Sequence, residues 1–72
     1  MAIVATEIES IHGSAEGQRL IFYRCRDSQW VWHRYGPVIC NDPAFDATAH
    51  MVVVAAKVSE QLAEQEAVQV IA

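Results

Sequence analysis

The sequence has few of the residues that usually build a chemical site. Its two cysteines, Cys25 and Cys40, and its three histidines form neither a Cys-x-x-Cys nor a His-x₃-His pair, so no local zinc-binding motif is present. Gly13 and Gly17 bound a loop, but no lysine follows them as it would in a phosphate-binding loop. We therefore expect no metal, no cofactor, no small-molecule substrate and no enzymatic activity.

Disulfide frameworks, targeting segments and long apolar runs are also missing. Two cysteines cannot form a disulfide framework, and the first residues lack the basic start of a secretory signal. The longest uncharged apolar run, residues 51–56, is far shorter than the roughly 20 residues of a membrane span. We expect synthesis in the reducing cytoplasm and no membrane contact. Cys25 is best interpreted as a small buried hydrophobe.

Positive charge is scarce. Five Lys and Arg face nine Asp and Glu, for a formal net charge of −4. A protein that binds duplex nucleic acid through its phosphates needs an excess of cations, so this balance argues against such a partner. The arginines lie in the first half and most acids of the second half lie in one predicted helix. The simplest interpretation of this uneven distribution is that the charged side chains are solvated. The alternative is that the basic half of one copy contacts the acidic half of another.

The first forty residues show the alternation of apolar and polar side chains that is typical of β-strands. The predicted strands are residues 2–12, 18–26 and 30–35. Gly36-Pro37 should bend or bulge the third strand, because proline cannot donate a ladder hydrogen bond, and residues 38–40 resume it. The short connections favour an antiparallel meander.

A long helix is predicted over residues 43–66. Asp42 suits the N-cap and Pro43 the first helical position. The apolar tail, residues 67–72, either continues the helix or runs extended. The whole chain, residues 1–72, is therefore predicted to be a single α+β domain of β-β-β-α order, with the sheet in residues 2–40.

The predicted helix carries more apolar surface than a three-stranded sheet can cover. Its polar side chains fall within a sector of roughly 100°, and almost everything else around it is apolar or small. Its 24 residues span about 36 Å, whereas a compact domain of this length has a diameter of roughly 28 Å. We therefore expect contact with other subunits. The expected interface residues are Trp30, Trp32, Val52, Val53, Ala56, Leu62, Val68, Val70 and Ile71.

Trp30 and Trp32 leave three interpretations open. The alternation puts them on one strand face together with Arg34. They could form the core beneath the helix, or anchor a protein interface, where Trp and Arg are enriched. With the neighbouring arginines they could also stack on single-stranded nucleic acid or on a sugar.

Several features resemble small virion or virion-associated proteins of tailed bacteriophages and prophages. These features are the aromatic strand that runs into residues 33–37, the helix start at residues 42–46, and an Ala/Val/Glu/Gln helix that reaches the terminus. The resemblance implies a non-enzymatic structural subunit of a multi-copy assembly, such as a tail, connector or capsid-associated protein. The partners would be other copies of the chain or a larger assembly protein, and the location would be a virion.

Two other functions remain open. The first is a small regulatory or inhibitory module that docks its acidic helix on a host protein. The second is a single-stranded nucleic acid binder that uses Trp30 and Trp32 with Arg24 and Arg34.

Overall fold

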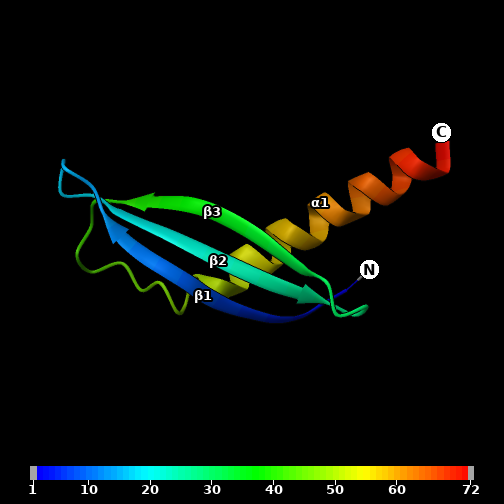
Figure 1. The fold of residues 1–72 in the computed structure, drawn as a ribbon, viewed down its shortest axis with the longest axis horizontal. Helices are drawn as coiled ribbons and strands as arrows, with labels where there is room; N and C mark the ends of the chain where they lie inside the picture. The colour runs from blue at the N-terminus through cyan, green and yellow to red at the C-terminus, as the bar shows by residue number, and fades with distance from the viewer. Residues whose placement is uncertain (1, 72) are drawn as a thin grey trace.

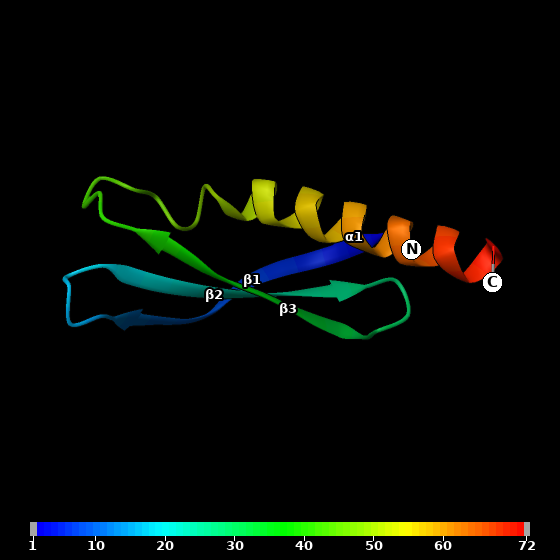
Figure 2. The same ribbon diagram turned by 90° about the horizontal axis from the view of Figure 1, so that it is seen from above.

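The computed structural model describes residues 2–71, and the side chains of residues 2–65. Its elements are β1 (Ile3–Gly13), β2 (Arg19–Asp27), β3 (Trp32–Cys40) and α1 (Met51–Ile71). The strands form one antiparallel sheet in the order β1-β2-β3. The helix lies across one face of this sheet, which gives two layers (Figures 1 and 2). The predicted β-β-β-α order of an α+β fold is confirmed.

Strand alternation decides which side chains enter the core. On the central strand β2, Ile21, Tyr23 and Cys25 are fully buried on the side of the helix. The residues between them point to the other face, as the sequence predicted. Cys25 is thus a buried free thiol, and the Thr6 hydroxyl lies 3.5 Å from its Sγ.

The helix buries only one stripe of its surface. Val54, Val58 and Leu62 recur every four residues and complete the core against β2. Val52, by contrast, is 77% exposed and Val53 is 45% exposed. The sheet therefore shields a single row of the helix and leaves two large aliphatic side chains in solvent.

The molecule is elongated. Its extents are 44 × 22 × 16 Å and its radius of gyration is 13.9 Å, compared with about 11 Å for a compact chain of 72 residues. The last turns of α1 run past the end of the sheet (Figures 1 and 2). The backbone of α1 continues to Ile71, so residues 67–71 are helical rather than extended. Within the described residues, no helix has the length and hydropathy that a membrane crossing requires.

The helix begins at Met51, eight residues later than predicted. Asp42 caps only a short turn, in which its Oδ1 accepts from the Ala44 amide. The guanidinium of Arg19 on β2 then donates to the carbonyls of Asp42 and Phe45, at 2.8 and 3.3 Å. These carbonyls therefore accept from a side chain of the sheet, and this contact competes with the backbone hydrogen bonds of a continuous helix.

Asp46 caps a second turn, and α1 follows from this one. Its Oδ1 accepts from the Thr48 and Ala49 amides at 3.0 and 3.1 Å, and the turn that it caps leads into α1. The Tyr23 hydroxyl, on β2, ties this turn to the sheet by donating to the Ala47 carbonyl at 2.9 Å. Burial raises the pKa of the Tyr23 hydroxyl, and the nearby Asp46 carboxylate adds to the rise.

A β-bulge interrupts the pairing of β2 with β3. Ile21 faces Val38 and Tyr23 faces Tyr35, so Phe22 alone stands opposite both Gly36 and Pro37. Gly36 has a φ of +139°, and a Cβ added there would lie 2.9 Å from the Ile21 carbonyl oxygen. Because the two strands lie this close together, only glycine fits at residue 36. The bulge predicted at Gly36-Pro37 is confirmed.

Candidate functional site

The face of the sheet opposite α1 presents a row of aromatic rings and guanidinium groups, which we call the ladder face. No other element of the described chain covers it (Figure 2). Trp30 is 73% exposed and Trp32 is 44% exposed, so neither belongs to the core beneath the helix. The residues of the ladder face are Phe22, Arg24, Arg26, Trp30, Trp32 and Arg34.

Each ring of the ladder face is paired with one arginine. The guanidinium carbon of Arg26 lies 3.8 Å from the centre of the Trp30 ring. The corresponding distances are 4.6 Å for Arg24 over Trp32 and 4.6 Å for Arg34 over Phe22. All three lie within the range of cation–π attraction, so the rings and the arginines hold one another in place.

Two of the arginines also have carboxylate partners on β1. Arg24 and Arg34 stand directly opposite each other across β2 and β3, an arrangement in which like charges repel. Arg24 is paired with Glu7, and the Nε of Arg34 donates to Glu9 at 2.7 Å. The two acids of β1 therefore compensate the repulsion at this pair.

Arg26 is the exception. Its neighbour on β1 is Ala5, so the register brings no carboxylate beside it. Its Nε is buried and has no hydrogen-bond partner within the described residues. The ladder face thus ends, at Arg26 and Trp30, in a stacked arginine that lacks an acidic partner there.

Trp30 reaches its position through an unusual turn. The sequence predicted that Trp30 starts the third strand, but β3 starts at Trp32 and Trp30 lies in the connection from β2. Its φ is +66°, a left-handed conformation that costs a bulky residue about 1–2 kcal/mol. In that conformation its side chain turns back over Arg26. Strained positions of this kind cluster at functional sites.

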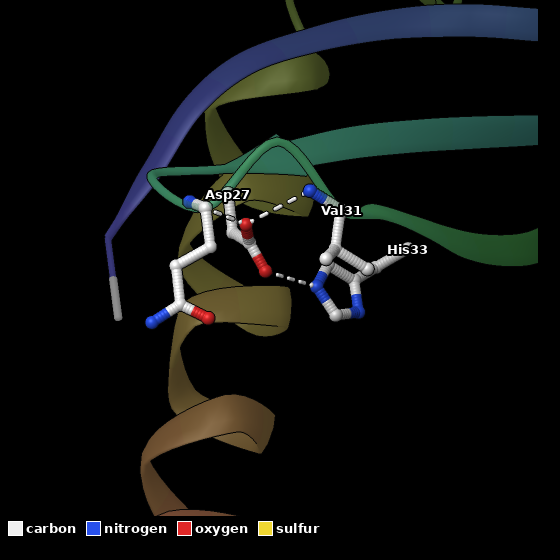
Figure 3. Close-up of polar contacts among 4 residues, drawn as sticks. Asp27, Val31 and His33 are labelled. Atoms are coloured by element: carbon white, nitrogen blue, oxygen red, sulfur yellow. Dashed lines mark hydrogen bonds and ion pairs between the residues drawn. The ribbon is translucent and has the colours of Figure 1, made fainter.

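Asp27 holds this turn together (Figure 3). Its Oδ1 accepts from the Gln29 and Val31 amides at 2.8 and 3.1 Å, and its Oδ2 lies 2.8 Å from His33 Nε2. The side chain is only 1% exposed. The hydrogen bond with His33 lowers the pKa of Asp27, against the opposing effect of burial, and the two backbone amides lower it further. A charged, fully partnered Asp27 therefore positions the loop that presents Trp30.

A second exposed surface, apolar in its first turns and acidic further along, lies on α1 on the side roughly opposite its buried stripe. We call it the outer helix face and define it by the exposed residues Val52, Val53, Ala56, Glu60 and Glu64. Three of the predicted interface residues, Val52, Val53 and Ala56, lie there.

Leu62 requires a correction. It was expected in an interface, but it is 6% exposed and packs in the chain's own core, because it follows Val54 and Val58 at four-residue spacing. The predictions for Val68, Val70 and Ile71 concern side chains that lie outside the described residues.

The residues of a possible metal or nucleophilic site are scattered. Within the described part of the chain, no three His, Cys, Asp or Glu side chains come together in a way that could hold a metal ion. His12 lies against Phe22, whereas His33 binds Asp27 and His50 lies against Phe45.

Sequence reasoning identified the two tryptophans but not their relation to Arg26. The alternation already placed Phe22, Arg24 and Arg26 on one face of the second strand. What it could not provide was the register, which sets Ala5 beside Arg26 and the two glutamates beside the other arginines.

A scan against protein-family models, a search of curated proteins and a search of solved structures each found no match to this chain.

Proposed function

We propose that the chain is a non-enzymatic assembly subunit that acts through protein–protein contacts in a multi-copy complex. The observation that carries the proposal is the ladder face, where two exposed tryptophans stack on arginines outside the core. Tryptophan and arginine are the residues most enriched among those that dominate binding energy in protein interfaces.

The rigidity of the ladder face supports this function. Stacking and ion pairs hold Arg24 and Arg34 before any partner arrives. An interface formed by such side chains loses little conformational entropy on binding. The exposed valines of the outer helix face add a second surface of the kind that subunits bury.

We extend the proposal to a bacteriophage virion, as a tail, connector or capsid-associated subunit. The basis for this step is the resemblance of the aromatic strand and of the Asp-Pro turn before the helix. A virion subunit would meet its partners as other copies of itself or as a larger structural protein.

Binding of single-stranded nucleic acid is the second candidate, because aromatic rings alternate with arginines on the ladder face. Two observations weigh against it. Glu7 and Glu9 neutralise two of the three arginines, and the net charge of the chain is −4. Both features reduce attraction to phosphates. A third candidate, a regulatory module that docks its acidic helix on one target, would be a stable monomer alone.

Sedimentation velocity over a range of micromolar concentrations tests the proposed function. We expect the wild-type chain to associate, and Trp30→Gly to shift the distribution toward monomer while the circular dichroism spectrum is retained. Ala15→Glu, in the exposed β1–β2 loop, serves as a control that should associate like the wild type. A wild-type chain that is monomeric throughout, and that associates with no virion protein, contradicts the proposal.

Titration with a single-stranded oligonucleotide separates the second candidate. Stacking on Trp30 and Trp32 would quench their fluorescence, and added salt would reverse the effect. We expect no salt-sensitive quenching.

A further inference from the structure

Resting on the proposed self-assembly, we infer that the occupant of the ladder face is the outer helix face of a second copy. Because α1 and the sheet form two layers (Figure 2), the outer side of the helix and the uncovered face of the sheet lie on opposite sides of one molecule, with the core between them. A copy bound in this way still offers its own ladder face to a third copy. The contact is therefore head to tail, and it grows into a stack or closes into a ring.

Charge complementarity supports this pairing. The ladder face carries Arg24, Arg26 and Arg34, and Arg26 has no acidic partner within the described residues. The outer helix face carries Glu60 and Glu64, both exposed, and the exposed Lys57 beside them offsets one of the two charges. A carboxylate from this helix would give the stacked Arg26 the partner that its own strand neighbour, Ala5, cannot supply.

The apolar parts of the two surfaces also fit. The exposed rings of Trp30 and Trp32 need an apolar cover, and Val52, Val53 and Ala56 are exposed on the helix. The outer helix face runs over residues 52–64 and spans about 20 Å, and the part of the ladder face on β2, residues 22–26, spans about 17 Å, so the two surfaces have similar lengths. The result is a sheet with a helix on each face, an arrangement that recurs among folded domains.

A symmetric pairing of two ladder faces is disfavoured. It would bring three arginines of one copy against three of the other, with only Glu7 and Glu9 of each copy to offset them. Juxtaposed like charges are a common means by which interfaces reject a partner. The helix-to-sheet contact avoids this repulsion.

Two variants that each block one surface test the inference. Trp32→Glu removes a ring from the ladder face and puts a carboxylate beside Arg24 and Arg26, so the monomer should fold. Val53→Asp puts a charge on the outer helix face, in the first turn of α1, where the helix dipole favours an acid. Circular dichroism checks that both are folded, and Ala15→Glu controls for added negative charge.

The informative experiment is to mix the variants. Each variant alone should be monomeric, because a head-to-tail contact needs both surfaces. An equimolar mixture should form a dimer of one copy of each and grow no further, since Trp32→Glu retains the helix surface and Val53→Asp retains the ladder face. Light scattering would measure twice the mass of one chain.

The other outcomes overturn the inference. A mixture that stays monomeric, although the wild type associates, means that the ladder face and the outer helix face do not bind each other, and the proposed self-assembly still stands. Normal association of either variant alone excludes the surface that it alters. A wild-type chain that never associates removes the proposed self-assembly itself.

Discussion

At the scale of single residues, Asp27 has the greatest influence on the candidate site. It is buried, it accepts from two backbone amides, and it is paired with His33 across the start of β3. Its hydrogen-bond partners, the Gln29 and Val31 amides and His33, all follow it on the same hairpin, so the geometry of the loop depends on this carboxylate. Through the loop it sets the position of Trp30.

The lowered pKa of Asp27 predicts acid sensitivity. Its folded-state pKa lies below the ordinary 3.8, so the charged form stabilises the fold at pH values above about 4, and this stabilisation is lost as the pH falls through the lowered pKa. Asp27→Asn keeps an oxygen for the two amides but cannot titrate. The fall in thermal midpoint between pH 6 and pH 2.5 should therefore be smaller in Asp27→Asn than in the wild type. Glu16→Gln, in the exposed β1–β2 loop, should fall as the wild type does; equal falls in all three proteins would refute the assignment.

The two tryptophans should respond differently to glycine. Trp30→Gly removes a ring from a left-handed position, where glycine relieves about 1–2 kcal/mol of strain and offsets the lost stacking on Arg26. Trp32→Gly removes a ring from a strand, where glycine is itself unfavourable. We expect urea unfolding to show Trp32→Gly less stable than Trp30→Gly by about 1–2 kcal/mol. The reverse order would mean that Trp30 is held without strain.

At the scale of elements, the bulge at Gly36 fixes the register that aligns the ladder face. Gly36→Ala would bring a Cβ within 2.9 Å of the Ile21 carbonyl oxygen and 3.2 Å of the Phe22 ring. We expect a loss of about 1–3 kcal/mol in the free energy of unfolding. Gly13→Ala is the matched control, because a Cβ there meets nothing within 4 Å. Equal urea midpoints for the two variants would show that the bulge tolerates a side chain.

The elements also show how far the sequence could be interpreted. The order of strands, the two-residue alternation on β2 and the bulge at Gly36-Pro37 are local signals, and each appears in the structure. The helix start is not local, because Arg19 reaches from β2 to the carbonyls of Asp42 and Phe45. Trp30 was misassigned for a related reason, since nothing in its own sequence marks a bulky residue in a left-handed turn.

Only part of the candidate site could be predicted from the sequence. Excess apolar surface on the helix was predictable from its residues, and Val52 and Val53 are indeed exposed. Which aliphatic side chains enter the core depends on how the helix sits on the sheet, and this is why Leu62 was assigned to the wrong surface.

At the scale of the whole molecule, a small and elongated domain should gain stability from its neighbours. If copies bind only when folded, a tenfold increase in protein concentration adds about 1.4 kcal/mol per interface once binding is saturated. For a domain of this size that raises the thermal midpoint by several degrees, about 4–8 °C per kcal/mol. Scanning calorimetry at a series of concentrations measures the shift. Trp32→Glu and Val53→Asp, which each block one surface, should show no change of midpoint with concentration. A constant wild-type midpoint would contradict self-association.

The irregular pairing of the two edge strands, β1 and β3, has a consequence for the shape of any larger assembly of this chain. Pairing is irregular at two points along β1 and at the proline-containing step of β3, so each rim of the sheet is twisted out of line. New strands therefore have no straight border to join. If copies assemble as proposed, growth would proceed through the layers, perpendicular to the hydrogen-bonded plane, rather than as the ribbon-like fibrils that an unbroken sheet edge favours.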